Sequence, residues 1–290
     1  MGKASAVAGL LTGALVWGLI WYPYRLLEEA GVRGTVSTLI TYSVALAAAC
    51  ILFRRHLRAL CRPDPLLILI GLSAGWTNLG YVLGMIHGPV MQVLLLFYLA
   101  PLWTVVFAAL LLGERPGFMG LLVILLALAG AATMLWQPGT NLPVPRSAAE
   151  WFGLSAGVGF ALSNVLIRKA RHLEIPVKAV AVFAGVVTTA MVVAALEGTP
   201  PGGSLRAGPE VLLLLVVVGL VIFATNLAVQ HGLMRVSANR AIVLLLSELV
   251  VAAVSSYVLA SEAMHWNQWT GGAMIVAATL LSGRLGQEQP

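Results

Sequence analysis

The sequence has little charge and almost no cysteine. Only 10% of its 290 residues are Asp, Glu, Lys or Arg, whereas about a quarter of a soluble domain is charged. With 60% hydrophobic residues and a mean hydropathy of +0.95, that shortage excludes an ordinary soluble domain. Two cysteines, Cys50 in an apolar run and Cys61 in a basic loop, suggest neither a disulfide framework nor a metal site. The composition therefore predicts an all-α integral membrane protein with no metal and no cofactor.

Apolar segments recur along the chain at a length that suits a bilayer. A hydrocarbon core of ~30 Å requires about 20 apolar residues per helix, and Gly and Pro mark the boundaries between such segments. By this measure we predict ten spans: Ala6–Tyr24, Val36–Phe53, Leu66–Ile86, Val90–Leu112, Gly117–Trp136, Glu150–Ile167, Val177–Leu196, Val211–Met234, Ala238–Leu259 and Trp269–Gly283.

The second half of the chain repeats the first. The tripeptide Thr-Asn-Leu occurs at 77–79 and again, 148 residues later, at 225–227, and Glu114 and Glu262 follow at the same offset. So long a period indicates a duplicated half-protein. Each half has five spans, an odd number, so the halves lie inverted in the membrane, as in many transporters. We predict an N-terminal half, a linker and a C-terminal half, at residues 1–137, 138–149 and 150–290.

The basic residues predict the orientation of the chain. With the N-terminus in the cytoplasm, thirteen of the 17 Lys and Arg residues fall on the cytoplasmic side, and only Arg25, Arg33, Arg146 and Arg206 lie outside. This distribution follows the positive-inside rule. Both termini are therefore expected in the cytoplasm. The net charge of +6 is then a consequence of topology, and we expect a lipid bilayer and no nucleic acid as a partner.

Ionisable groups within the spans are few, and each is a functional candidate because it is costly in lipid. Glu248 lies near the middle of the ninth span, either lining a cavity or bonded to a neighbouring helix. His231, preceded by Gln230, lies near the cytoplasmic end of the eighth span. It is either an interhelical hydrogen-bonding residue or a proton relay. We take Glu248 and His231 as candidates for coupling or gating.

The repeat also pairs two amides, Asn78 and Asn226, at mid-depth. They either contact a solute between the halves or are satisfied by a carbonyl of a helix. Tyr81 follows Asn78 at i+3, and Gln230 follows Asn226 at i+4, so each lies on the helical face of its amide.

Aromatic residues lie inside the spans as well as at their ends. Trp and Tyr at span ends are interfacial anchors, but several residues are too deep for that role: Trp17, Trp76, Tyr81, Tyr98 and Trp103. Such rings offer flat apolar walls to a ligand. No basic residue lies mid-span, although phosphate recognition usually needs paired Arg or Lys. A small amphiphilic solute is therefore expected. Pro101, within the fourth span, interrupts helical hydrogen bonding and forms either a gating hinge or a static kink.

The fourth span of each half ends on an acidic motif, Gly-Glu-Arg-Pro at 113–116 and Ser-Glu-Ala at 261–263. With ten spans in a five-plus-five repeat, the whole chain resembles the EamA family of the drug/metabolite transporter superfamily. That resemblance implies a bacterial inner-membrane exporter of aromatic amino acids and others such as Thr and Met, with methyl viologen resistance as a side activity. It also implies a central cavity lined by spans 1, 3, 4, 6, 8 and 9, which carry Trp17, Asn78, Tyr81, Tyr98, Asn164, Asn226, Gln230 and Glu248.

We therefore expect a transporter that works by alternating access, in which aromatic residues hold the side chain of the solute and Asn78, Asn226 and Glu248 bind its head group. An alternative with the same fold is efflux of aromatic or quaternary cations, held by Glu248 and by cation–π attraction. A membrane enzyme is disfavoured because the His and acidic residues form no cluster at catalytic spacing. A purely structural protein would not need mid-span amides and a deep carboxylate. The oligomeric state carries no sequence signal.

Overall fold

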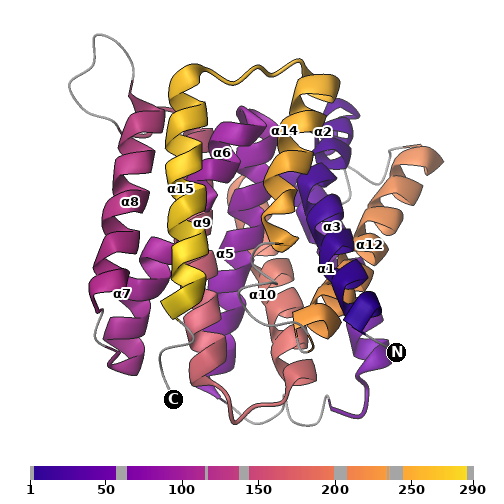
Figure 1. Cartoon of the computed structure of the whole chain (residues 1–290). Helices are drawn as coiled ribbons and strands as arrows, with labels where there is room; N and C mark the ends of the chain where they lie inside the picture. The colour runs from indigo at the N-terminus through magenta and orange to yellow at the C-terminus, as the bar shows by residue number, and fades with distance from the viewer. Residues whose placement is uncertain are drawn as a thin grey trace.

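The computed structural model describes residues 3–56, 64–114, 117–136, 144–198, 208–233, 235 and 244–285. All regular structure in these ranges is helical (Figure 1). The helices are α1 (Lys3–Leu19), α2 (Trp21–Glu29), α3 (Gly34–Leu52), α5 (Pro65–His87), α6 (Val90–Phe97), α7 (Ala100–Leu112), α8 (Phe118–Leu135), α9 (Ala148–Lys169), α10 (Ile175–Leu196), α12 (Pro209–Leu233), α14 (Ser247–Ala260) and α15 (Trp266–Leu285).

These helices confirm the predicted membrane architecture of ten spans. Within the described ranges, eight helical segments are long and apolar enough to cross a bilayer, and two of them, Ala4–Glu29 and Val90–Leu112, are each made of two consecutive helices. Helices α14 and α15 take the places of the ninth and tenth spans. The first span continues past its predicted end because α2 is amphipathic, with apolar residues buried and charged residues at its far end. Residues 238–243 of the predicted ninth span and residues 138–143, half of the predicted linker, lie outside the described ranges.

Successive spans run in alternating directions, so the two ends of the bundle are chemically distinct. Helix α1 begins and α15 ends at the same end, the lower one in Figure 1. We call this end the terminal face and the opposite end the distal face. The turn between α5 and α6 and the segment between α14 and α15 both lie at the distal face.

The inverted repeat is visible in how glycines let helices approach. A Cβ atom on Gly84 of α5 would lie 3.2 Å from the carbonyl oxygen of Ala149 on α9. A Cβ on its repeat counterpart, Gly232 of α12, would lie 2.8 Å from the carbonyl oxygen of Ala6 on α1. In each half, the third span therefore packs against the first span of the other half, through the small-residue contacts typical of membrane helices.

The fourth span of each half is broken at the same depth. Helix α6 ends at Phe97 and α7 begins at Ala100, with Pro101 in the first turn of α7. This break is the interruption expected from Pro101, because proline is tolerated only at the start of a helix. Helix α14 begins after a turn at Leu246, which the 148-residue offset relates to Tyr98. Discontinuous helices at equivalent positions of inverted halves are typical of binding sites in secondary transporters.

Candidate functional site

The two helix breaks meet in a hydrogen bond that joins the halves. The hydroxyl of Tyr98, at the α6–α7 break, donates to Oε2 of Glu248 at 3.0 Å. Glu248 lies in the first turn of α14 and is only 8% exposed. The positive end of the α14 dipole favours a negative charge there. The sequence predicted both residues as cavity residues, and the structure brings them into direct contact.

An aromatic cluster adjoins this bond. The ring of Phe97 lies 5.4 Å from that of Tyr81, 6.1 Å from that of Tyr98 and 5.2 Å from that of Phe160, between centroids. The Tyr81 hydroxyl reaches the backbone carbonyl of Trp17 at 3.5 Å. Rings in such edge-to-face and tilted arrangements form a stable apolar wall. Two predicted residues, Tyr81 and Tyr98, thus lie against Phe97, and a third, Trp17, contacts Tyr81 through its backbone carbonyl.

The two repeat-related amides differ in their partners. Nδ2 of Asn78 donates to the carbonyl of Ala74 at 2.8 Å, and its Oδ1 accepts a hydrogen bond from the Tyr42 hydroxyl at 2.5 Å. Nδ2 of Asn226 likewise donates to the carbonyl of Ile222 at 3.0 Å. Each amide therefore uses one N–H for its own helix and keeps a second N–H for another acceptor.

One side of helix α9 is covered by another helix near the distal face of the bundle and is exposed toward the terminal face. Cβ atoms on Gly153 and Gly157 would meet the carbonyl oxygens of Val93 and Phe97 at 2.7 and 2.5 Å, so α6 covers this part of the helix. Farther along the same face, at i+3 and i+4 spacing, Phe160 is 41% exposed and Asn164 is exposed too. Asn164, a predicted cavity residue, thus lies on an open stretch that starts at the aromatic cluster.

The remaining predicted residues lie outside this cluster. His231, in the last turn of α12, accepts through Nδ1 a hydrogen bond from Nη1 of Arg235 at 2.8 Å, near the terminal face. Gln230 is half-buried beside it. The buried indole N–H of Trp103, on α7, has no hydrogen-bond partner among the described residues. It is therefore a buried donor whose acceptor does not lie among the described residues.

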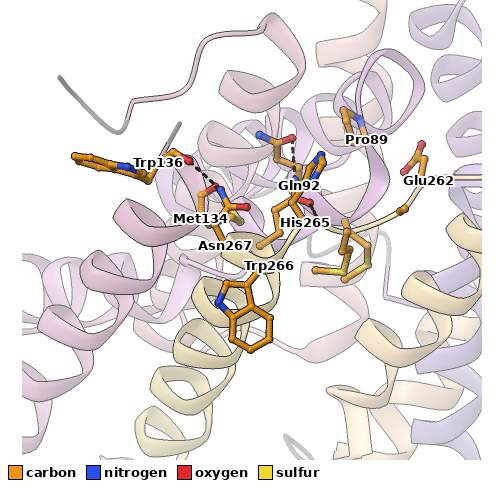
Figure 2. Close-up of a pocket in the computed structure, with 12 residues that line it drawn as sticks. Pro89, Gln92, Met134, Trp136, Glu262, His265, Trp266 and Asn267 are labelled. Carbon is orange, nitrogen blue, oxygen red and sulfur yellow. Dashed lines mark hydrogen bonds between the residues drawn. The ribbon is translucent and has the colours of Figure 1, made fainter. Parts of the chain in front are cut away.

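A separate pocket of about 740 Å³ opens at the distal face (Figure 2). One amide orders its rim with two hydrogen bonds: Nδ2 of Asn267 donates to the carbonyls of Met134 and Trp136. Exposed Trp136 and Trp266 flank it, as expected for aromatic residues at a membrane interface. None of the predicted cavity residues lines this pocket; Glu262 and Pro89 do.

Several residues of the site were not predicted. Tyr42 lies on α3, and the resemblance did not place that span at the cavity. Phe97 and Phe160 have no polar atom to mark them. Arg25 and Glu262, which form an ion pair at 2.8 Å, were seen only as a loop charge and a fold motif. The repeat could have predicted this pair. In both halves it places a basic residue at the end of the first span and an acidic residue at the end of the fourth.

The arrangement defines a class: a polytopic helical membrane protein with inverted halves and broken helices around a buried carboxylate. The model of the EamA-like transporter family matches the chain twice, over residues 4–136 and 147–284. The chain belongs to this family of membrane transporters.

Two relatives agree with this assignment, and a solved structure shares the fold. The chain is 28% identical to an uncharacterized transporter of Archaeoglobus fulgidus over 79% of the chain and 80% of the relative. It is 27% identical to an uncharacterized transporter of Pseudomonas aeruginosa over 57% of the chain and 55% of the relative. A protein of known crystal structure shares the fold, with a TM-score of 0.60 and 19% identity over 99% of both chains. The chain is thus a multi-pass membrane transporter.

Proposed function

We propose that this transporter exports amino acids, aromatic ones and others such as Thr and Met, by alternating access. The observation that carries the proposal is the Tyr98–Glu248 hydrogen bond, which lies at two equivalent helix breaks and beside an aromatic cluster. A buried carboxylate suits the ammonium group of an amino acid, and aromatic walls suit its side chain. Strong recognition of an amphiphilic solute needs both kinds of surface close together.

In this proposal, the solute takes over hydrogen bonds that the protein makes to itself. Its ammonium group binds Glu248 and displaces the Tyr98 hydroxyl, since a hydrogen bond between two oppositely charged groups is stronger than one in which only the carboxylate is charged. Its carboxylate binds the second N–H of Asn78 and of Asn226. The breaks near Pro101 and Leu246 act as hinges, because the helix bonds are already interrupted there.

We further propose that the terminal face is cytoplasmic and that the membrane is the bacterial inner membrane. The charge distribution supports this orientation, and the exposed stretch of α9 from Phe160 to Asn164 runs toward that face. The solute would enter along it. The halves 1–137 and 150–290 then move against each other. Reporter fusions at the C-terminus should be active only as cytoplasmic reporters.

The test is transport by purified protein in liposomes. Uptake of radiolabelled phenylalanine, threonine and methionine should be saturable, and Asn78→Ala and Asn226→Ala should each reduce it. Unchanged transport in both variants would rule out the paired amides as head-group ligands. Repeating the assay with an imposed pH gradient shows whether proton movement, through Glu248 or His231, is coupled to the solute.

A second candidate function is efflux of aromatic cations such as methyl viologen. It is favoured by the contact between Glu248 and aromatic Tyr98, because a carboxylate and aromatic faces together attract a delocalised cation. Competition separates the two functions. If methyl viologen is the main cargo, it should inhibit phenylalanine transport and itself be transported, whereas an amino-acid exporter should transport phenylalanine in its presence.

A further inference from the structure

Two ion pairs occupy equivalent positions at opposite faces of the bundle. At the distal face, Arg25 of α2 pairs with Glu262, which follows α14. At the terminal face, Arg168 of α9 pairs with Glu114, which follows α7. Glu114 and Glu262 are repeat counterparts. The first spans of the halves align at an offset of 144 residues, with Gly9 and Gly13 against Gly153 and Gly157, so Arg168 adjoins Lys169, the counterpart of Arg25. Each pair therefore ties the end of a first span to the end of the fourth span of the other half.

The distal pair also holds a third element, the turn between α5 and α6. Arg25 donates from Nε to the carbonyl of Met85 at 2.9 Å and from Nη2 to the carbonyl of Gly88 at 2.6 Å. Oε2 of Glu262 accepts from the backbone N–H of Val90 at 2.7 Å. We call this set of five residues the distal clasp.

The chemistry of the clasp matches the helix ends that it holds. The carbonyls at the end of α5 have no partners within the helix and carry its negative dipole, so a guanidinium satisfies them. The N–H of Val90 starts α6 and has no partner within that helix, so a carboxylate satisfies it. Arg25 and Glu262 bind these groups and each other at once. The Arg25 guanidinium also lies 4.8 Å from the centroid of the Trp21 ring.

The two ends of the bundle differ in how closed they are. The side chains of Arg25 and Glu262 are 19% and 23% exposed. In the terminal pair the carboxylate is equally covered, with Glu114 24% exposed, but Arg168 is 56% exposed. Directly inside the clasp, Nε1 of Trp21 donates to Oγ of Ser255 at 3.1 Å, and Ser255 donates to the carbonyl of Gly18 at 3.2 Å. The distal end is thus sealed by several layers, while α9 is exposed toward the terminal face.

We propose that Arg25 and Glu262 are the latch of a distal gate. The latch holds the first span of one half and the fourth span of the other against the α5–α6 turn, and it releases that turn when solute leaves at the distal face. This role rests on the alternating-access function proposed above. The pocket beside the clasp, which Glu262 and Pro89 line (Figure 2), is then the space that a released solute enters.

The test measures gate opening without any substrate. Ser255, 6% exposed behind the clasp, is replaced by cysteine in a background in which Cys50 and Cys61 are serine. A membrane-impermeant maleimide is then added to sealed vesicles that have the distal face outside. Trp266→Cys, at a position 80% exposed at that face, verifies the vesicle orientation and should be labelled quickly in every variant.

We expect Glu262→Gln to accelerate labelling of Ser255→Cys about tenfold, because a weaker latch raises the open population. Arg25→Lys keeps the charge but loses the planar set of donors, so it should accelerate labelling to a smaller extent. The matched control is Glu114→Gln at the terminal face, which should leave the rate unchanged. Each variant must remain monodisperse in size-exclusion chromatography.

Two results would overturn the latch: labelling at the original rate in both distal variants, or an equal acceleration by Glu114→Gln, which would indicate general loosening. A wrong assignment of the transported solute would give a different result. If phenylalanine is not transported but the distal variants alone accelerate labelling, the latch stands and the amino-acid assignment falls.

Discussion

The two fourth spans have the same backbone and different chemistry. Each is interrupted at the same depth, yet the N-terminal half presents a phenol at its break, Tyr98, and the C-terminal half presents a carboxylate, Glu248. An inverted duplication supplies two equivalent helix breaks. The groups beside them are not repeat counterparts, because the 148-residue offset relates Tyr98 to Leu246 and Glu248 to Ala100. The pair therefore combines one phenol and one carboxylate, as the proposed amphiphilic solute requires.

The largest expected effect on transport comes from removing the negative charge of Glu248. Glu248→Gln should lower the transport rate of phenylalanine about 10- to 100-fold, the equivalent of the ~1.5–3 kcal/mol of a hydrogen bond to a charged group. Tyr98→Phe should lower the transport rate less, because it removes a neutral donor and keeps the aromatic face. The measurement is initial uptake into liposomes.

Glu210→Gln is the control, because Glu210 is an exposed carboxylate at the start of α12 in the same half. It should leave uptake unchanged. Equal losses in Glu248→Gln and Tyr98→Phe would contradict a division of roles between carboxylate and phenol.

A second difference concerns Gly13 and Gly157, which the 144-residue offset of the first spans relates. A Cβ on Gly157 would meet the backbone carbonyl of Phe97 at 2.5 Å, whereas the nearest atoms to one on Gly13 are side-chain atoms of Val229 and Leu245. A valine side chain moves more easily than a helix backbone. Gly157→Ala should therefore destabilise the protein by about 1–3 kcal/mol, and Gly13→Ala by less. Thermal unfolding in detergent would reveal the order, and a larger loss for Gly13→Ala would contradict it.

Sequence reasoning was strongest where the bilayer dictates the pattern. The ten spans follow from hydrophobic length, and the break at Tyr98 was foreshadowed by Pro101, which removes a helix hydrogen bond. The sequence around the matching break at Leu246 has no proline and so gave no signal for it. Glu248 was recognisable as a costly deep charge, but its bond to Tyr98 spans 150 residues and depends on how the halves dock.

The same limit explains the residues that were missed. Tyr42 pairs with Asn78 because α3 packs beside α5, a helix–helix contact with no local signature. Arg25 and Glu262 were visible as charges at span ends, but only folding shows that both also bind the α5–α6 turn. The depth of a side chain in the membrane can be predicted from one sequence, whereas the residues that it bonds cannot.

A third and smaller difference separates the two amides. In Asn78, both Nδ2 and Oδ1 form hydrogen bonds, and the partner of Oδ1 is Tyr42. In Asn226, Nδ2 donates to a carbonyl of its own helix. Tyr42→Phe removes one buried hydrogen bond and should destabilise the protein by about 0.5–1.5 kcal/mol. Asn78→Ala should accordingly lower the thermal midpoint more than Asn226→Ala. A reversed order would indicate that the Tyr42 bond adds no stability.

The smallest expected effect lies where α5 begins at the terminal face. Oδ1 of Asp64 accepts from the backbone N–H of Leu66 at 2.8 Å, and Oδ2 lies 3.1 Å from Nε2 of His172. The Leu66 bond first, and the His172 bond second, hold the pKa of Asp64 below its ordinary value of 3.8. A carboxyl whose pKa is lowered by folding stabilises the protein above that ordinary value, and this contribution disappears as the pH falls through the lowered pKa.

Asp64→Asn keeps a side chain that caps a helix well and removes only the charge. The variant should therefore lower the thermal midpoint slightly at neutral pH, since exposed ion pairs contribute little. The difference from the original protein should shrink as the pH falls below 3.8, because the native carboxyl then becomes neutral as well. Measuring both midpoints over that range tests the sign. A difference that grew on acidification would show that the cap, and not the charge, stabilises the start of α5.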